Sequence, residues 1–195
     1  MLTTEIDHPT PEEPVIERHT LILAGCAAAL LCASPAAGQT PDPHVIESPT
    51  YTFIPLEIDV DRPAEEVWAR VGKFCDIGEW FQIPCTITSG NGTDLGSVRS
   101  VANEVMVGKT ELSYTYTQTP RADRPYDLYH GTLEARPVTA TTSKLVYTLM
   151  YDNSMLPDDA ARAADRERRV TTFTRALENM KTLAEGGTLP PRQGR

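Results

Sequence analysis

Two cysteines in the middle of the chain are the residues whose types and spacing most directly suggest chemistry. Cys75 and Cys85 lie ten positions apart in the stretch GKFCDIGEWFQIPC and bracket Trp80 and Phe81. Such a pair can form a redox couple, supply half of a metal site, remain as two buried thiols or close a disulfide. A redox active site typically uses the tighter Cys-x-x-Cys spacing. The choice among the others depends on the compartment, because disulfides persist in oxidising surroundings.

An apolar run near the N-terminus predicts export. Residues 21–33, LILAGCAAALLCA, form an uncharged run of 13 residues, whereas a membrane-spanning helix needs about 20. Small residues follow, as at a signal-peptidase site, and we expect cleavage after Gly38 or, alternatively, after Ala36. We therefore predict an N-terminal extension with signal peptide over residues 1–38, a Pro-rich linker over 39–50, and a periplasmic or secreted mature chain.

Two features of this region leave alternatives open. Residues 1–17 contain five acids and no Lys or Arg, whereas a signal peptide usually begins with positive charge. One hypothesis is that Val15 is the true start, which places the signal peptide at about residues 15–38. The stretch LAGC ending at Cys26 resembles a lipobox, but the apolar run continues through Leu31, which favours a cleaved signal over a lipoprotein.

Removal of the signal peptide decides how many cysteines remain. Cys26 and Cys32 are lost with it, which leaves a single pair in an oxidising compartment. We predict a Cys75–Cys85 disulfide, with two buried thiols as the alternative. The loop it closes is short, and the chain-entropy model gives it about 2–3 kcal/mol.

The net charge, the apolar runs and the histidines of the chain indicate which classes of binding partner the chain is not expected to use. The formal charge is −9 and becomes −5 without residues 1–38, which argues against nonspecific binding of nucleic acid or anionic membranes. No second apolar run is long enough to span a membrane, so the mature chain is expected to lack a transmembrane segment. Only His44 and His130 remain after cleavage, and neither zinc nor nucleotide motifs occur. We predict neither a metal nor a cofactor.

The mature sequence begins with a strand and two short helices. Residues 51–60, YTFIPLEIDV, alternate between apolar and polar and predict a half-buried strand. Pro63 and the acids after it open a short helix that Gly72 ends. Residues 73–80 predict a second short helix. Strand-like runs separated by turn signals follow up to residue 152, and the segment 104–118 is either two strands or one bent at Gly108.

A long helix is predicted to close the domain. Asp158 and Asp159 open it, and Gly186-Gly187 ends it after Glu185. Phe173 belongs to its apolar face. The fold class is α+β: a curved antiparallel sheet of about six to seven strands wrapped around this C-terminal helix, with two short helices after the first strand. Such an arrangement tends to leave a hollow between sheet and helix. Residues 187–195 are expected to be a disordered tail.

This order of elements, together with four stretches, resembles the SRPBCC superfamily over residues 51–186. The superfamily is the START-like helix-grip group that includes polyketide cyclases, lipid-transfer START domains and abscisic-acid receptors. The stretches are RPAEEVWARVGKFCDIGEW, GNGTDLGSVRSV, KTEL and MLPDD. The strand 84–89 lacks the Lys with which the receptors hold their ligand, so the resemblance does not support a hormone receptor. It implies a helix-grip fold that can host many functions.

Aromatic residues on the predicted inward faces are the main candidates for binding a ligand. Five tyrosines project toward a common interior if the strand registers hold, and the alternative for them is a filled core. By the resemblance, Arg99 and Glu111 match charged groups that face the ligand in relatives, where they can pair or orient a substrate. The predicted ligand-binding residues are Trp80, Phe81, Arg99, Glu111, Tyr114, Tyr116, Tyr129, Tyr147, Tyr151 and Phe173.

The predicted function is binding of a small hydrophobic molecule (lipid, aromatic or polyketide-like) by an exported helix-grip protein. The alternative is an enzyme of the polyketide cyclase or dehydratase type, in which Glu111, Arg99 or a Tyr hydroxyl steers proton transfer. A third possibility is a structural or partner-binding module of the envelope. A cavity lined by Tyr114, Tyr129 and Tyr147 would favour the first two. The sequence assigns no catalytic residue.

Overall fold

The computed structural model describes residues 45–191, so the predicted signal peptide and most of the linker lie outside the described residues. The domain begins with strand β1, Tyr51–Val60, and helix α1, Ala64–Val71. Pro63 fixes the backbone just before α1 and Gly72 follows its last residue, as the sequence predicts. Helix α2, Ile77–Trp80, is the second short helix. Both short helices therefore follow the first strand.

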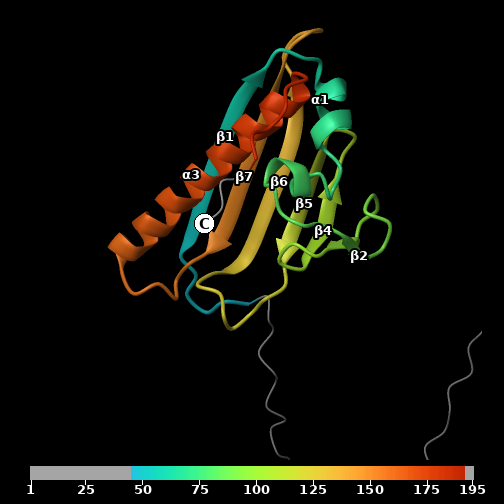
Figure 1. Ribbon diagram of the computed structural model, residues 1–195. Helices are drawn as coiled ribbons and strands as arrows, with labels where there is room; N and C mark the ends of the chain where they lie inside the picture. The colour runs from blue at the N-terminus through green and yellow to red at the C-terminus, as the bar shows by residue number, and fades with distance from the viewer. Residues whose placement is uncertain (1–44, 192–195) are drawn as a thin grey trace, which may run out of the picture. The chain divides into compact units, whose positions relative to one another are not determined.

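Six further strands complete an antiparallel sheet. They are β2 (Ile87–Ser89), β3 (Val98–Arg99), β4 (Glu104–Lys109), β5 (Ser113–Gln118), β6 (Asp127–Pro137) and β7 (Ser143–Asp152). The strand order β1-β7-β6-β5-β4-β3-β2 places neighbours in the chain side by side, except that β1 pairs with the last strand (Figure 1). The segment 104–118 forms two strands, and β2 is shorter than the predicted strand 84–89.

Helix α3, Asp159–Ala184, crosses the sheet on the side of β1 and β7 (Figure 1). Asp158 caps it, because its carboxylate accepts a hydrogen bond of 2.7 Å from the backbone N–H of Ala161. The buried face includes the predicted Phe173 together with Ala176, Leu177, Met180 and Leu183. This arrangement confirms the predicted helix-grip fold: an antiparallel sheet with a long C-terminal helix and short helices after the first strand.

A disulfide joins Cys75 and Cys85, with a sulfur–sulfur distance of 1.99 Å. It connects the turn before α2 to the residues that precede β2, as predicted. The C-terminal residues differ from the expected disordered tail up to residue 191. Leu189 packs against the core, and the side-chain amide of Gln82 donates a hydrogen bond of 2.7 Å to the carbonyl of Pro190. This part of the tail is therefore held against the domain.

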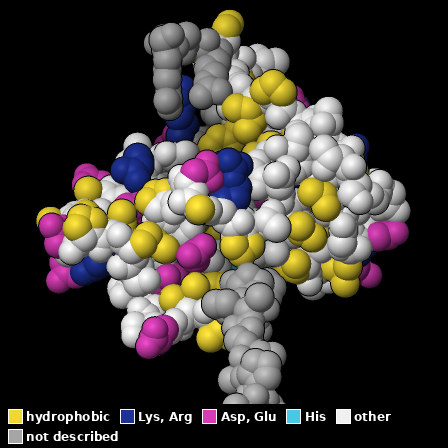
Figure 2. All heavy atoms as spheres, turned by 90° about the horizontal axis from the view of Figure 1, so that it is seen from below, with side chains coloured by type: hydrophobic (Ala, Val, Ile, Leu, Met, Phe, Trp, Pro, Cys, Tyr) yellow, Lys and Arg dark blue, Asp and Glu magenta, His cyan; other side chains and the backbone are white. Residues whose placement is uncertain are grey.

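The surface of the described residues mixes charge and apolar groups. Figure 2 shows apolar side chains in separate groups, with acidic and basic side chains between them. This face therefore presents no uniform charge. Within residues 45–191, no helix combines the length and the apolar character needed to cross a bilayer.

Candidate functional site

The five tyrosines predicted to face the interior do so, and their rings fill it. Tyr114, Tyr116, Tyr129 and Tyr151 form a column in which the centroids of successive rings lie 6.4, 6.2 and 5.8 Å apart. The hydroxyl of Tyr147 is hydrogen bonded to that of Tyr116 at 2.9 Å. All five side chains are buried. Their positions correspond to the filled-core alternative, and a ligand-binding role for them remains a prediction.

A glycine makes room for this column. Gly131 in β6 pairs directly with Tyr116 in β5, and a Cβ atom at residue 131 would lie 2.4 Å from the Tyr116 hydroxyl. No side chain larger than hydrogen therefore fits there without displacing the ring. The glycine in the middle of a strand thus marks a close approach of an aromatic ring to the backbone.

Arg99 lies fully buried at one end of the column. Its Nε and Nη2 atoms lie 2.6 and 2.5 Å from the carboxylate of Glu104, the residue opposite it in the register of β3 and β4. Its Nη1 atom donates to the carbonyl of Phe74 at 2.6 Å and, at 3.3 Å, to the hydroxyl of Tyr114. The guanidinium also lies 4.4 Å from the centroid of the Phe74 ring. Arg99 thus binds three elements together.

The acid that pairs with Arg99 is Glu104 and not Glu111. Sequence reasoning considered only Glu111, because the resemblance pointed to it. The alternation of β4 offered a signal for Glu104, since Glu104 and Met106 lie on the same buried face of the strand. Glu111 is exposed in the turn between β4 and β5.

Burial governs the protonation of this cluster. It raises the pKa of Glu104, against the opposing effects of Arg99 and of the Gln118 amide that donates to it. Burial alone would lower the pKa of Arg99, but its interactions with Tyr114 and Glu104 raise it overall. Burial also raises the pKa of Tyr114, while Arg99 acts in the opposite direction. At neutral pH the guanidinium is therefore charged, and the Tyr114 hydroxyl keeps its proton.

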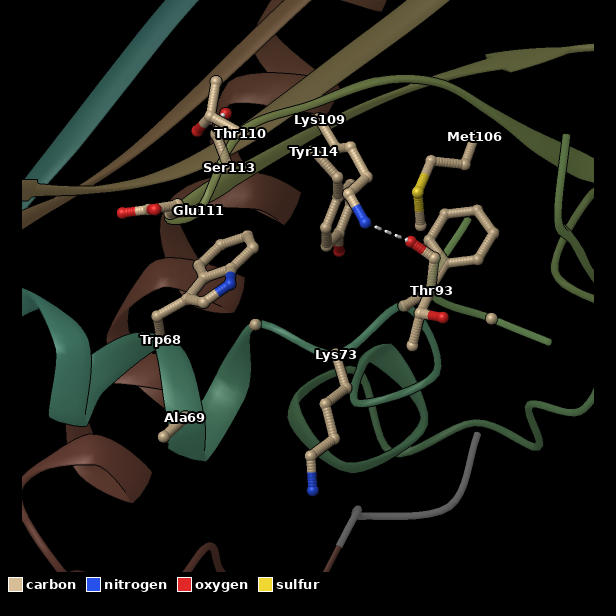
Figure 3. A pocket seen from close by; sticks show the side chains of 13 residues that line it. Trp68, Ala69, Lys73, Thr93, Met106, Lys109, Thr110, Glu111, Ser113 and Tyr114 are labelled. Atoms are coloured by element: carbon tan, nitrogen blue, oxygen red, sulfur yellow. Dashed lines mark hydrogen bonds between the residues drawn. The ribbon is translucent and has the colours of Figure 1, made fainter. Parts of the chain in front are cut away.

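A pocket of about 560 Å³ lies between α1 and the hairpin formed by β4 and β5 (Figure 3). We call it the hairpin pocket. Its apolar lining consists of Trp68, Phe74, Met106 and Tyr114, and its exposed polar residues are Lys73, Thr93, Lys109, Thr110 and Glu111. Three of the apolar residues are almost completely buried, and Trp68 is half-buried. Trp68 and Tyr114 lie next to each other at its border, whereas the Lys73 side chain is directed away.

Local packing fixes the walls of the hairpin pocket. The Trp68 ring lies 5.7 Å from that of Tyr114. A Cβ atom at residue 72 would lie 2.3 Å from the Trp68 ring, so Gly72 allows the indole to lie against the backbone that ends α1. On the far side, the Lys109 ammonium donates a hydrogen bond of 2.8 Å to the carbonyl of Thr93 in the loop between β2 and β3. The pocket is therefore bordered by α1 with the residues after it, by the loop between β2 and β3, and by the hairpin of β4 and β5.

The predicted ligand-binding residues divide between this pocket and the core. Glu111 and Tyr114 line the hairpin pocket, and Arg99 lies behind Tyr114. Trp80, Phe81, Tyr147 and Phe173 instead contact one another beneath α3, with Tyr147 and Phe173 only 4.8 Å apart. The remaining three, Tyr116, Tyr129 and Tyr151, belong to the column of tyrosines and do not line the pocket.

Sequence reasoning missed three residues of the pocket lining. Trp68 and Phe74 fit the apolar sides of two ordinary short helices, and nothing in the sequence singled out Met106. A usable signal was Trp68, a large aromatic residue four positions before Gly72, the glycine that ends α1. Because Gly72 has no side chain, one side of the indole is left uncovered. For metals, no group of three or more His, Cys, Asp or Glu side chains suited to ligation occurs in the part of the chain that the structure describes.

Comparison with known protein families shows which family the chain belongs to. Residues 54–185 match the model of the family described as polyketide cyclase / dehydrase and lipid transport. The chain belongs to this family. Its membership agrees with the SRPBCC resemblance and with the helix-grip architecture. No curated protein is significantly similar to the chain in sequence.

Solved structures with low sequence identity share the fold of this family member. A solution structure from Thermobifida fusca has 22% identity and a TM-score of 0.58, with coverage of 71% of this chain and 97% of the other. Truncated norcoclaurine synthase from Thalictrum flavum has 13% identity and a TM-score of 0.55, with coverage of 72% of this chain and 98% of the other. An aromatase/cyclase from a Streptomyces species has 17% identity and a TM-score of 0.54, with coverage of 71% of this chain and 100% of the other. At these identities the likeness concerns the fold alone.

Proposed function

We propose that this chain is an exported helix-grip protein that binds a small, mainly apolar molecule in the hairpin pocket. The observation that carries the proposal is the lining of that pocket: three aromatic residues and Met106 around a volume of about 560 Å³. Small-molecule sites are typically concave, mainly apolar and about 300–1,000 Å³ in volume, with a few polar groups that fix orientation. The hairpin pocket has these properties.

The polar groups of the pocket suggest how a ligand is oriented. The Tyr114 oxygen accepts a hydrogen bond from Arg99, so its own proton is available to an acceptor atom on the ligand. Glu111 and Lys109 lie at the exposed rim and favour the polar end of a ligand at the solvent side. Met106 adapts to different ligand shapes because its side chain is flexible and polarisable.

Export is supported by the apolar N-terminal run and by the disulfide. The Cys75–Cys85 bond is of the kind that persists in oxidising compartments. N-terminal sequencing of the mature protein tests this part of the proposal. We expect a start at residue 39 or 37, whereas a mature chain that retains residues 21–33 would contradict the cleaved signal.

Native mass spectrometry of the protein purified from its own host tests ligand binding. We expect a copurifying small molecule that is lost in the Trp68→Ala variant. The matched control is Phe53→Ala, because Phe53 is an exposed aromatic residue on β1 and does not line the pocket. Equal ligand occupancy in wild type and Trp68→Ala would contradict the proposal. Absence of any ligand would favour the third possibility, an envelope module that binds a partner.

The enzyme alternative is favoured by one feature of the pocket. Glu111 at the rim and Tyr114 in the wall both line the pocket, and a carboxylate and a hydroxyl can exchange protons with a substrate. The family and two of the structural neighbours include cyclases or synthases. Turnover of a copurified ligand that is lost in Glu111→Gln and retained in Glu134→Gln would establish catalysis, because Glu134 is a partly exposed acid on β6 that pairs with Arg136 and does not line the pocket. Loss of turnover in both variants would not establish a catalytic role for Glu111.

A further inference from the structure

The Cys75–Cys85 disulfide connects two of the segments that border the hairpin pocket. Cys75 directly follows Phe74, which belongs to one wall. Cys85 precedes β2, and the loop after β2 supplies Gly92 and Thr93 to the opposite wall. We propose that reduction of this disulfide opens the hairpin pocket and releases its ligand. The inference rests on the proposed function and adds a redox control of the same site.

Besides the disulfide, the wall on the Cys85 side is held by hydrogen bonds between short segments and by the packing of Ile87 against the core. Thr86 and Ser100 exchange two of these hydrogen bonds, and the Gly92 N–H donates a third to the Ser97 hydroxyl. β2 has three residues and β3 two, and their register contains two pairs with an irregularity between Ile87 and Ser89. β2 is also the edge strand of the sheet. The loop after it is bonded to the hairpin by the exposed Lys109, which donates to the Thr93 carbonyl, and by the Gly96 N–H, which donates to the Met106 carbonyl at 2.8 Å. Short edge strands of this kind open locally at low cost.

The wall on the Cys75 side is anchored independently of the disulfide. The Phe74 carbonyl accepts a hydrogen bond from the buried Arg99, and the Phe74 ring packs edge-on against Tyr114. Ile77 and Trp80 in α2 are buried as well. Arg99 also keeps β3 in place, because it belongs to that strand. Reduction should therefore release β2 and the loop after it, and leave Phe74 and β3 where they are.

The disulfide is accessible to a thiol reductant, because both cysteines are only partly buried. A thiolate of the reductant attacks one sulfur, which breaks the Cys75–Cys85 bond, forms a mixed disulfide and releases the other cysteine as a thiolate that takes up a proton. A second thiolate of the reductant then displaces the attached cysteine. Two electrons and two protons pass to the protein, and the dithiol reductant becomes a disulfide.

The experiment uses the full chain with Cys26→Ser and Cys32→Ser, so that only Cys75 and Cys85 can react with the reductant. Binding of 1-anilinonaphthalene-8-sulfonate is measured for the oxidised protein and after reduction with dithiothreitol. We expect affinity to fall at least tenfold on reduction. Hydrogen exchange should accelerate over residues 85–93 and stay unchanged in α3. Trp68→Ala shows which part of the binding belongs to the hairpin pocket, and Cys75→Ser/Cys85→Ser should behave as the reduced form throughout.

The outcomes separate this inference from the proposed function. Equal Trp68-dependent binding in both redox states overturns the inference and leaves the proposed function intact. If neither redox state shows Trp68-dependent binding, the proposed binding site is wrong. Hydrogen exchange over residues 85–93 then decides the inference: faster exchange on reduction supports opening of this segment, and unchanged exchange overturns it. Loss of protection in α3 on reduction also overturns it, because the disulfide would then hold the whole fold.

Discussion

The interior beneath α3 and the hairpin pocket are built from the same kind of residue but differ in what covers them. Under α3, Tyr147, Phe173 and Trp80 contact one another and fill the space. Beside α1, Trp68 and Tyr114 leave a pocket of about 560 Å³. α3 packs over β1 and β7, whereas the shorter α1 packs on β6 and contacts the hairpin of β4 and β5 through Trp68. The covering helix, more than residue type, therefore decides whether aromatic side chains fill a space or line one.

The largest expected effect comes from the buried ion pair where the two regions meet. Arg99→Ala leaves Glu104 as an unpaired buried charge, and we expect a loss of about 3–5 kcal/mol in the free energy of unfolding. Urea denaturation followed by circular dichroism measures it. The control is Arg70→Ala, which removes an exposed pair with Glu79 and should cost about 1 kcal/mol or less. Similar losses in the two variants would contradict the structural role of Arg99.

A methyl group added to the filled interior should cost less than this but still be clear. Gly131→Ala places a Cβ atom 2.4 Å from the Tyr116 hydroxyl, and we expect a loss of about 1–3 kcal/mol of stability. Gly108→Ala in β4 is the matched control, because its Cβ would meet Thr115 at an ordinary 3.4 Å. Thermal unfolding compares the two. A tolerated Gly131→Ala would show that the column of tyrosines can rearrange.

Removing single hydroxyl groups distinguishes the two regions functionally. Tyr116→Phe deprives the buried Tyr147 hydroxyl of its partner and should cost about 1 kcal/mol of stability without changing ligand affinity. Tyr114→Phe should weaken ligand binding by removing the donor in the pocket. Isothermal titration with the copurified ligand, together with denaturation, measures both quantities. Equal affinities in the two variants would remove Tyr114 from the site.

The smallest expected effect is a pH dependence from Glu104. Burial raises the pKa of this carboxyl above its ordinary 4.5, so the folded state takes up the proton before the unfolded state does. Its ionisation therefore destabilises the fold above the folded pKa, and this penalty disappears below about pH 4.5. The stability of wild type relative to Glu104→Gln should rise as the pH falls from 7 toward 4.5. Denaturation at several pH values checks this, and a fall would mean that Arg99 outweighs burial.

The fold was predictable because local patterns determine its elements. Alternation in β1, the proline and glycine around α1 and the caps of α3 all lie within a few residues of what they control. The disulfide was predictable as well, since the predicted signal peptide leaves only two cysteines. The site was less accessible. The inward direction of the tyrosines follows from strand period, but whether rings fill or line a space depends on where a helix lies in space, as α1 does relative to Tyr114.

The partner of Arg99 illustrates the same limit. Glu104 lies only five positions from Arg99, across a tight loop in which Ala102 and Asn103 adopt positive φ values of 51° and 53°. Neither residue type demands this conformation, so the sequence did not indicate the turn that aligns the pair. The pocket lining was missed for a related reason, because Trp68 fits the pattern of an ordinary core residue.

The pairing of β1 with β7 also determines when the sheet can be completed. The register runs from Tyr51 opposite Asp152 to Val60 opposite Ser143, so the first strand of the domain bonds only to the last. At about 5–20 residues per second, a ribosome leaves β1 without its partner for roughly 5–20 seconds. Pairs so distant in the chain also form slowly, since long loops must close first. A nascent chain of this protein therefore stays without its complete sheet until its last strand has been made.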